Sequence, residues 1–426
     1  MIEKYYSGVI EQIYNRIGKE TRNIVMANYS NDFSIENLEV IRRYQSNEDN
    51  VFFAYSEFSY NTLVGAYEPF LDIICNMHRR FIGGSFDDFQ KECGVYYLHR
   101  QVLNSYYETG ECFREETVLL NEVAYEQRRM TMAIADMLKK LSEVKPLMIV
   151  INRFQMASKS SIETIKYLID NPCANIGIVL GVNAIVKGTD STVEVWDRIV
   201  ESLEDRSAIY YIGSAGPLKN NVKTTNDDEL YITMNFEQSI QEASNIMEFL
   251  DFEQARRGCR IIEHKLKFED AWIDEKSLRR FYMVYARTSV LLGEMSKAIE
   301  LTNEYKALIP ENDSEHYLSL YYFMKGTCYM YQGKLEKAGN SAKSAYDYAV
   351  LAEDDTLIFK AELLSVMIKM SGWYNIFFCV QDIPVSDEII EKLIKHGYRN
   401  HLAHIYIYAY DNSRDVVKQP FMMNHY

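Results

Sequence analysis

The chain has 426 residues and a formal net charge of −15, and 47% of its residues are hydrophobic and 25% charged. This is enough apolar material for two hydrophobic cores. No uncharged apolar run reaches the roughly 18 residues of a membrane span, and the first residues carry charges where a signal peptide is apolar, so we expect a cytoplasmic protein with no membrane contact. The acidic balance argues against nucleic acid as the main partner, because cationic side chains supply most non-specific affinity for it.

The first predicted elements are a strand at Arg22–Asn28 and a helix at Ile35–Gln45, whose apolar residues recur at helical spacing. A strand, a loop and a helix in this order can cradle the phosphates of a nucleotide. The loop motif for this task reads G-x-x-x-x-G-K-[ST], and here it would be counted from Ala27. We therefore compare the residues of this loop with the motif.

The loop keeps one motif residue, Ser34. Ala27 and Asp32 stand in place of the two glycines, and Phe33 stands in place of the lysine that contacts the phosphates. Each lost charge-assisted hydrogen bond weakens binding by roughly tenfold or more. The sequence thus predicts a degenerate nucleotide site, with ATP binding that is absent or on the order of millimolar.

A second strand is expected at Val51–Phe58, followed by a mostly helical insert at Gly83–Glu143. The apolar run Leu147–Ile151 then predicts a parallel strand that is buried on both faces. In ATPases, acidic residues at the end of this strand hold Mg²⁺ and orient water. Here the strand ends in Asn152 and Arg153, so no catalytic residue is predicted.

Further strands are predicted at 175–182, beside the strand at 147–151, and at 207–212 and 229–235, with a polar loop at 219–228. Alternating strands and helices indicate a parallel sheet with right-handed crossovers, in a first domain that spans residues 1–235. The spacing alone leaves open that the two motif strands are ordinary buried strands of another α/β domain.

Strand patterns end there, and a helical repeat follows in residues 236–426. Tyr282–Pro310 and Tyr322–Val350 share a pattern of small residues and a turn glycine, 40 residues apart. Small residues let two antiparallel helices approach closely, so a solenoid of stacked helical hairpins is expected. The shared positions are Ala286, Gly293 and Ala298 in the first unit, and Gly326, Gly333 and Ala338 in the second.

The stretch Met148–Asp170 resembles the second acidic motif of STAND-type ATPases, the AAA-related signalling ATPases that tetratricopeptide repeats often follow. Asn152 and Arg153 replace the acidic pair of that motif, and Met156 and Ser158 replace its tryptophan and last acid. The resemblance covers about the first half of the chain, and the helical repeat resembles tetratricopeptide repeats. It implies a P-loop-like α/β domain followed by a TPR-like solenoid. The motif residues kept are Gln155, Ala157, Ser161, Glu163, Tyr167 and Leu168.

Two functions follow from this reading. The preferred one is a non-catalytic signalling or scaffold protein, in which a pseudo-ATPase domain accompanies repeats that bind a protein partner. The alternative is the sensory portion of a bacterial multidomain signalling enzyme or transcriptional regulator, for example of the diguanylate cyclase type, with weak residual nucleotide binding. No output domain is expected in the short tail after Asn412, and the oligomeric state stays open.

No cofactor or metal is expected. The seven cysteines are scattered, and none stands in C-x-x-C spacing, so they are expected to be reduced thiols. His401 and His404 share a helix face, but no further ligand is spaced with them.

Overall fold

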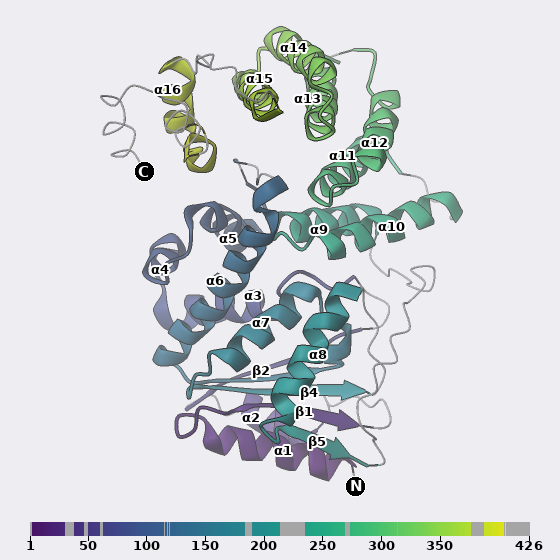
Figure 1. Ribbon diagram of the computed structural model, residues 1–426. Helices are drawn as coiled ribbons and strands as arrows, with labels where there is room; N and C mark the ends of the chain where they lie inside the picture. Colours follow the sequence, from purple (N-terminus) through teal and green to yellow (C-terminus); the bar gives the residue numbers. More distant parts are fainter. Residues whose placement is uncertain are drawn as a thin grey trace. The chain divides into compact units, whose positions relative to one another are not determined.

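The structure is a computed structural model, and it describes residues 2–29, 38–46, 50–59, 63–114, 116, 118, 120–183, 190–213, 235–268, 273–312, 314–375, 387–403 and 405. Its contacts divide the chain into two compact units (Figure 1). The first unit comprises Met1–Arg114 and Asn121–Ala271, and the second comprises Glu115–Leu120 and Trp272–Tyr426. The chain therefore passes between the units three times.

The first unit contains a parallel sheet of five strands in the order β2-β3-β4-β1-β5. All pairs of neighbouring strands are parallel, with Val25 beside Val179 and Ile149 beside Ile178. The predicted parallel sheet is thus confirmed, and the apolar run that predicted β3 is buried along its whole length. The strands are β1 (Ile24–Tyr29), β2 (Phe52–Glu57), β3 (Leu147–Asn152), β4 (Ile176–Asn183) and β5 (Ile209–Ile212).

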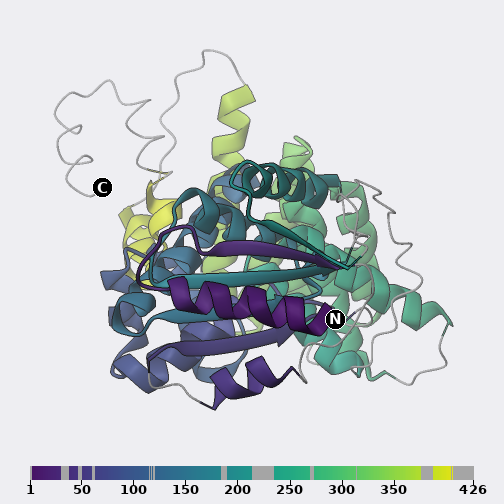
Figure 2. The ribbon, with the colours of Figure 1, turned by 90° about the horizontal axis from the view of Figure 1, so that it is seen from below.

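Helices cover both faces of this sheet (Figures 1 and 2). On one face lie α1 (Ile2–Arg16) and α2 (Glu39–Gln45). Helix α1 buries Ile10 and Ile13 against the sheet because its apolar residues recur every three or four positions. The other face carries α7 (Lys159–Asp170) and α8 (Asp190–Glu204), which contact each other.

The insert between β2 and β3 is mostly helical, as the sequence predicts. It contains α3 (Phe70–Met77), which continues as a π-helical turn at His78–Ile82, and then α4 (Phe86–Glu92), α5 (Tyr97–Thr109), a 3-10 turn at Leu120–Glu122 and α6 (Val123–Val144). A second 3-10 turn at Phe154–Met156 follows β3.

Helices α9 (Phe236–Glu248) and α10 (Phe252–Phe268) belong to the first unit, so the division of the structure differs from the domain boundary predicted after residue 235. Polar contacts account for the difference. The backbone N–H of Cys112 donates to Asn245 Oδ1 at 2.9 Å, and the backbone N–H of Ser160 donates to Asp251 Oδ2 at 3.0 Å. These bonds attach the helical pair to the α/β part of the chain.

The described residues of the second unit are mostly helical and include no strand, which confirms the helical character predicted for the C-terminal part. Each helix contacts the next one along the chain, as in a series of helical hairpins. The helices are α11 (Glu275–Leu291), α12 (Met295–Ala307), α13 (Glu315–Tyr331), α14 (Leu335–Leu351), α15 (Asp355–Asn375) and α16 (Asp387–His396).

One turn geometry recurs between these helices. Gly293 has a φ of +77° and donates its N–H to Val290 O at 2.9 Å, and Gly333 has a φ of +72° and donates to Met330 O at 2.9 Å. In both turns the next residue donates to the carbonyl five positions before it. The same pattern of bonds occurs at five further described residues with positive φ, which are Gly94 and Ser207 in the first unit and Leu250, Glu353 and Gly397 later in the chain.

A short segment from the N-terminal half of the chain belongs to the second unit, and we call its described residues Glu116, Val118 and Leu120 the strap. Glu116 is fully buried, and its Oε1 accepts the backbone N–H of His401 at 2.8 Å and lies 2.7 Å from His401 Nδ1. The backbone N–H of Leu120 donates to the hydroxyl of Tyr331 at 3.3 Å. The strap therefore connects residues of α13 and of the last described segment.

Some predicted elements lie outside the described residues. They are the loop at 30–37, which includes Asp32, Phe33 and Ser34, the first residues of the helix predicted from Ile35, the polar loop at 219–228 and all but the last residue of the strand predicted at 229–235. Among the helices that are described, none has the length and apolar character needed to cross a membrane.

Candidate functional site

Three of the nucleotide-binding residues predicted from the sequence are described by the structure, and they lie in or directly after strands, toward the carboxyl edge of the sheet. Ala27 is a buried residue of β1, Asn152 is the last residue of β3, and Arg153 follows it directly. Ligands of open α/β sheets bind outside the carboxyl ends of the strands, so this edge is the candidate site.

Asn152 connects two strands that are not neighbours. Its Oδ1 accepts a hydrogen bond of 2.6 Å from the hydroxyl of Tyr29, the last residue of β1, and both side chains are fully buried. Strand β4 lies between these two strands and carries Gly181 at this level. A Cβ atom on Gly181 would lie 3.0 Å from Asn152 Oδ1 and 2.5 Å from the hydroxyl of Tyr6, so the glycine leaves space for both polar groups.

Tyr6 of α1 lies beside this bond, on the face of the sheet that α1 covers. Its ring lies 6.3 Å from that of Tyr29 in an edge-on arrangement. Burial raises the pKa of Tyr6 well above its ordinary value, and the neighbouring Tyr29 and Glu57 raise it further. The phenol is therefore neutral, and it can donate or accept a hydrogen bond but carries no charge.

Arg153 has an ionic partner on the next strand. Its backbone lies in the left-handed region with a φ of +54°, and its Nη1 lies 3.0 Å from Glu57 Oε1 at the end of β2. The hydroxyl of Tyr55 donates to the other carboxylate oxygen of Glu57. Both charged side chains are mostly buried, with 22% and 17% exposure, so the pair is less screened by solvent than a surface pair.

The turn after β3 is attached to the neighbouring strand as well. The backbone N–H of Asn183, the last residue of β4, donates to Gln155 Oε1 at 3.3 Å. Side chains thus join the carboxyl ends of four strands: β1 to β3 by Tyr29, β2 to β3 by Arg153, and β3 to β4 by Gln155. We call this set of contacts the edge network.

The edge network determines what chemistry its carboxylate could perform. Hard cations such as Mg²⁺ prefer carboxylate oxygens and water as ligands. Glu57 supplies a carboxylate at this edge, but Arg153 neutralises its charge and Tyr55 occupies one of its oxygens. The arrangement favours rigidity at the ends of the strands over metal binding.

Sequence reasoning identified Asn152 and Arg153 but missed their partners Tyr29, Glu57 and Tyr6. A signal was present for Tyr29, which continues the alternation of Val25 and Ala27 on the inner face of β1. None was present for Gly181, because the need for a glycine arises only when β4 is inserted between β1 and β3.

The six residues predicted to pack the repeats occupy distinct places in the second unit. Ala286, Ala298 and Ala338 are buried in their helices, and Gly293 and Gly333 form the two turns described above. Gly326 lies in α13, where a Cβ atom would meet Leu364 Cδ2 at 3.0 Å and the carbonyl oxygen of Ala338 at 3.4 Å. Gly326 and Ala338 thus mark a close approach of α13 and α14.

The second unit also contains a surface groove among α14, α15 and α16, with a volume of about 240 Å³. Tyr346, Val366 and Ile389 supply its apolar lining, and Lys392 bridges Glu362 at 2.6 Å and Glu388 at 3.1 Å along its rim. Val350 and Leu351, which follow Tyr346 in α14, are 45% and 67% exposed. We call the groove together with these two residues the α14 patch.

Two further sets of residues have structural contacts. Tyr321 is buried and its hydroxyl accepts a bond of 2.7 Å from Lys325 Nζ, while Tyr322 stacks on Tyr348 at 5.6 Å. His401 is bonded to Glu116 of the strap, and His404 lies outside the described residues. Within the part of the chain that the structure covers, no three His, Cys, Asp or Glu side chains are grouped to hold a metal ion.

Comparison of the chain with protein-family models, with curated proteins and with solved structures found no match. The functional argument therefore depends on the residues themselves.

Proposed function

We propose that this chain is a non-catalytic signalling or scaffold protein, in which a degenerate ATPase domain of STAND type accompanies TPR-like repeats that bind a protein partner. The observation that carries the proposal is the edge network. At the end of β3, where hydrolysis needs acidic residues, Asn152 is bonded to Tyr29 and Arg153 is paired with Glu57.

The energies of these contacts support a structural role for this edge. Recruiting Glu57 to a metal ion would break its ion pair with the mostly buried guanidinium of Arg153. Removing one partner of a fully buried pair costs about 3–5 kcal/mol, and partial exposure lowers this cost for the present pair. A nucleotide would have to supply this energy without the phosphate-binding lysine, whose place Phe33 takes in the sequence.

The α14 patch supports the second half of the proposal. It combines an aromatic side chain, exposed aliphatic side chains and a charged rim, which is the composition of many protein interfaces. Interface energy is concentrated in a few residues of this kind. Tyr346 and Leu351 are therefore the residues expected to anchor a partner.

Phosphate release from Mg²⁺-ATP by the full-length protein tests the catalytic half. We expect no release above background for the wild type, and the same result for Glu57→Gln and for Glu3→Gln, an exposed glutamate of α1 that serves as the matched control. Release by the wild type that Glu57→Gln abolishes and Glu3→Gln preserves would show that Glu57 is a working catalytic acid, and the proposal would be wrong.

Capture of partners by the full-length protein tests the binding half. Leu351→Glu and Tyr346→Ala should each reduce recovery of the same partner by tenfold or more, because both remove apolar anchors of the patch. Tyr5→Ala is the matched control, since Tyr5 is an exposed tyrosine of α1. A partner recovered equally with all three variants would place the interface elsewhere and contradict this assignment of the α14 patch.

A further inference from the structure

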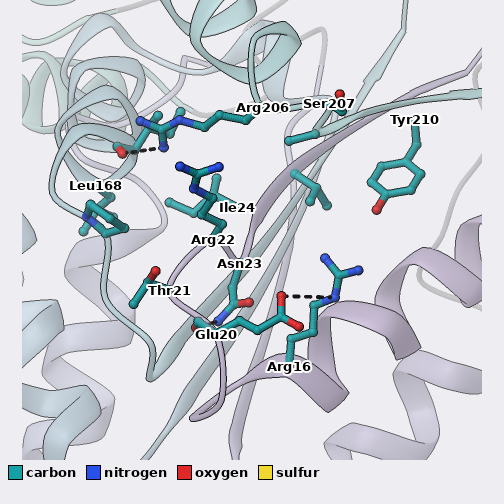
Figure 3. Close-up of a pocket in the computed structure, with 14 residues that line it drawn as sticks. Arg16, Glu20, Thr21, Arg22, Asn23, Ile24, Leu168, Arg206, Ser207 and Tyr210 are labelled. Atoms are coloured by element: carbon teal, nitrogen blue, oxygen red, sulfur yellow. Dashed lines mark hydrogen bonds and ion pairs between the residues drawn. The ribbon is translucent and has the colours of Figure 1, made fainter.

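The sheet has a second polar site at its opposite edge, where the strands begin. A cavity of about 190 Å³ opens between the last turn of α1, the loop before β1, the end of α7 and the turn before β5 (Figure 3). Three arginines, Arg16, Arg22 and Arg206, line it together with a single acidic residue, Glu20. The lining side chains therefore carry a net charge of about +2, in a chain whose net charge is −15.

The three arginines differ in how far they are already engaged. Arg16 pairs with Glu20 at 3.6 Å, and both side chains are solvent-accessible, so this pair is weak. Arg206 donates one N–H to the carbonyl oxygen of Ile169 at 2.8 Å, which orients its guanidinium and leaves its other N–H groups available. No described residue bonds or pairs with Arg22.

The positions of these arginines are fixed by backbone contacts. The carbonyl oxygen of Ala174 accepts the N–H of Gly18 at 2.8 Å and Asn23 Nδ2 at 3.1 Å, and these bonds anchor the loop that carries Arg22. On the other side, Ser207 has a φ of +51°, and the N–H of Ala208 donates to Leu203 O at 2.8 Å. The turn that carries Arg206 is thereby closed on the end of α8.

In Figure 3, Arg22 and Arg206 extend to the side of the cavity where α7 ends, and Arg16 lies with Glu20 on the other side. Thr21 and Ser207 add hydroxyl groups to the lining, and Leu168, Ile169 and Pro172 add an apolar wall. Guanidinium groups bind phosphate and carboxylate through paired N–H donors. A cavity with these walls can hold a charged head group and a short apolar substituent.

We propose that this cavity is a binding site for a small phosphate-bearing ligand, with Arg22 and Arg206 as its main donors. The charge selects phosphate over carboxylate, because a phosphate monoester carries about −1.5 to −2 near pH 7 and balances the lining, whereas one carboxylate leaves excess positive charge. The volume is below the roughly 300 Å³ at which pockets begin to enclose drug-sized ligands, so a phosphate or a short phosphate ester is favoured over a whole nucleotide. This proposal is independent of the function proposed above.

Calorimetric titration of the full-length protein tests this site, with inorganic phosphate, propyl phosphate and the monocarboxylate butyrate as the probes at one constant ionic strength. We expect one site per chain that binds phosphate or propyl phosphate at least tenfold more tightly than butyrate. Arg22→Gln should weaken this binding by about tenfold or more. Because Arg22 is exposed and no described residue bonds or pairs with it, its replacement should leave the fold intact, and an unchanged melting temperature without ligand checks this.

Arg128→Gln is the matched control, since Arg128 is an exposed arginine of α6 away from the cavity. The proposal is overturned if phosphate and propyl phosphate at about 10 mM produce neither heat nor a rise in melting temperature, because ligand binding at this concentration stabilises measurably when the dissociation constant is about 1 mM or lower. Equal weakening by Arg22→Gln and Arg128→Gln also overturns it, since binding would then be a non-specific charge effect. Butyrate binding as tight as that of propyl phosphate would exclude the assigned ligand class.

Discussion

The carboxyl and amino edges of the sheet differ in how far their charged side chains are paired within the protein. At the carboxyl edge, Arg153 and Glu57 neutralise each other, and Asn152 and Tyr29 bond across an intervening strand. At the amino edge, Arg22 forms no hydrogen bond or ion pair with a described residue, and Arg206 donates to the carbonyl oxygen of Ile169.

In an open α/β sheet, a ligand is expected at the carboxyl edge. In this protein, the polar side chains at that edge are already bonded to one another. The ends of the strands can form the walls of a site, but polar groups contribute to ligand binding only where they are not already bonded within the protein. Mutations at the two edges should therefore affect different properties of the protein. Those at the carboxyl edge change stability, and those at the amino edge change binding.

The largest effect is expected for Asn152→Asp, which places a carboxylate at a fully buried position beside Glu57. Burial raises the pKa of the new carboxyl in the folded state, so the loss of stability is present above that raised value and disappears as the pH falls below the value in the unfolded chain. We expect a loss of about 2–3 kcal/mol at pH 8 and a smaller one at pH 5. Urea unfolding at both pH values measures it.

Asn340→Asp is the control for this change, because Asn340 is an exposed residue of α14, and it should alter stability by less than about 0.5 kcal/mol at either pH. Equal effects of the two variants would show that the end of β3 is hydrated, and the edge network would then not be a buried one.

A smaller effect is expected for Gly181→Ala. The added methyl group would lie 2.5 Å from the Tyr6 hydroxyl and 3.0 Å from Asn152 Oδ1, so α1 or the Tyr29–Asn152 bond must shift, at a cost of about 1–3 kcal/mol. Gly8→Ala in α1 is the matched control, because a methyl group there meets no atom within 4 Å. Alanine favours the helix, so the control should be stabilised by up to about 1 kcal/mol. If both substitutions stabilise the protein in thermal unfolding, the network tolerates a separation of its strands.

The smallest effect on stability is expected for Arg22→Gln. Substitutions of exposed residues without contacts change the free energy of unfolding by less than about 0.5 kcal/mol. Chemical unfolding with and without phosphate measures both properties, and the variant should match the wild type without phosphate and lose the stabilisation that phosphate gives. A large loss of stability in the absence of ligand would mean that the amino edge, like the carboxyl edge, is a structural network.

The described strands lie within two residues of their predicted positions, because short apolar runs bounded by polar residues are a strong local signal. Of their order in the sheet, only the pairing of β4 with β3 was predicted, since β1 acquires β4 and β5 as neighbours through crossovers that no local pattern encodes. Helix α1 was missed although Ile10, Ile13 and Ile17 recur at helical spacing, so this signal was present and unused.

Some of the functional residues could be located from the sequence, and others could not. Asn152 and Arg153 could be located because they directly follow a predictable strand. Arg22 and Arg206 are 184 positions apart in the chain, and they meet only because β1 and β5 are paired in the sheet. The turn at Gly397 repeats the bonds of the turns at Gly293 and Gly333, but its helices lack their small residues, and the sequence pattern therefore gave no consensus there.

The strap has a consequence for the order in which this protein acquires its structure during synthesis. Glu116 leaves the ribosome 285 residues before His401, the residue whose backbone and ring it contacts. At translation rates of about 5–20 residues per second, this interval lasts roughly 15–60 s. The strands and helices of the first unit that follow the strap, from α6 to α10, are synthesised within that time. The strap is the first segment of the second unit to be synthesised, but Glu116 can contact His401 only after nearly all of that unit has been made.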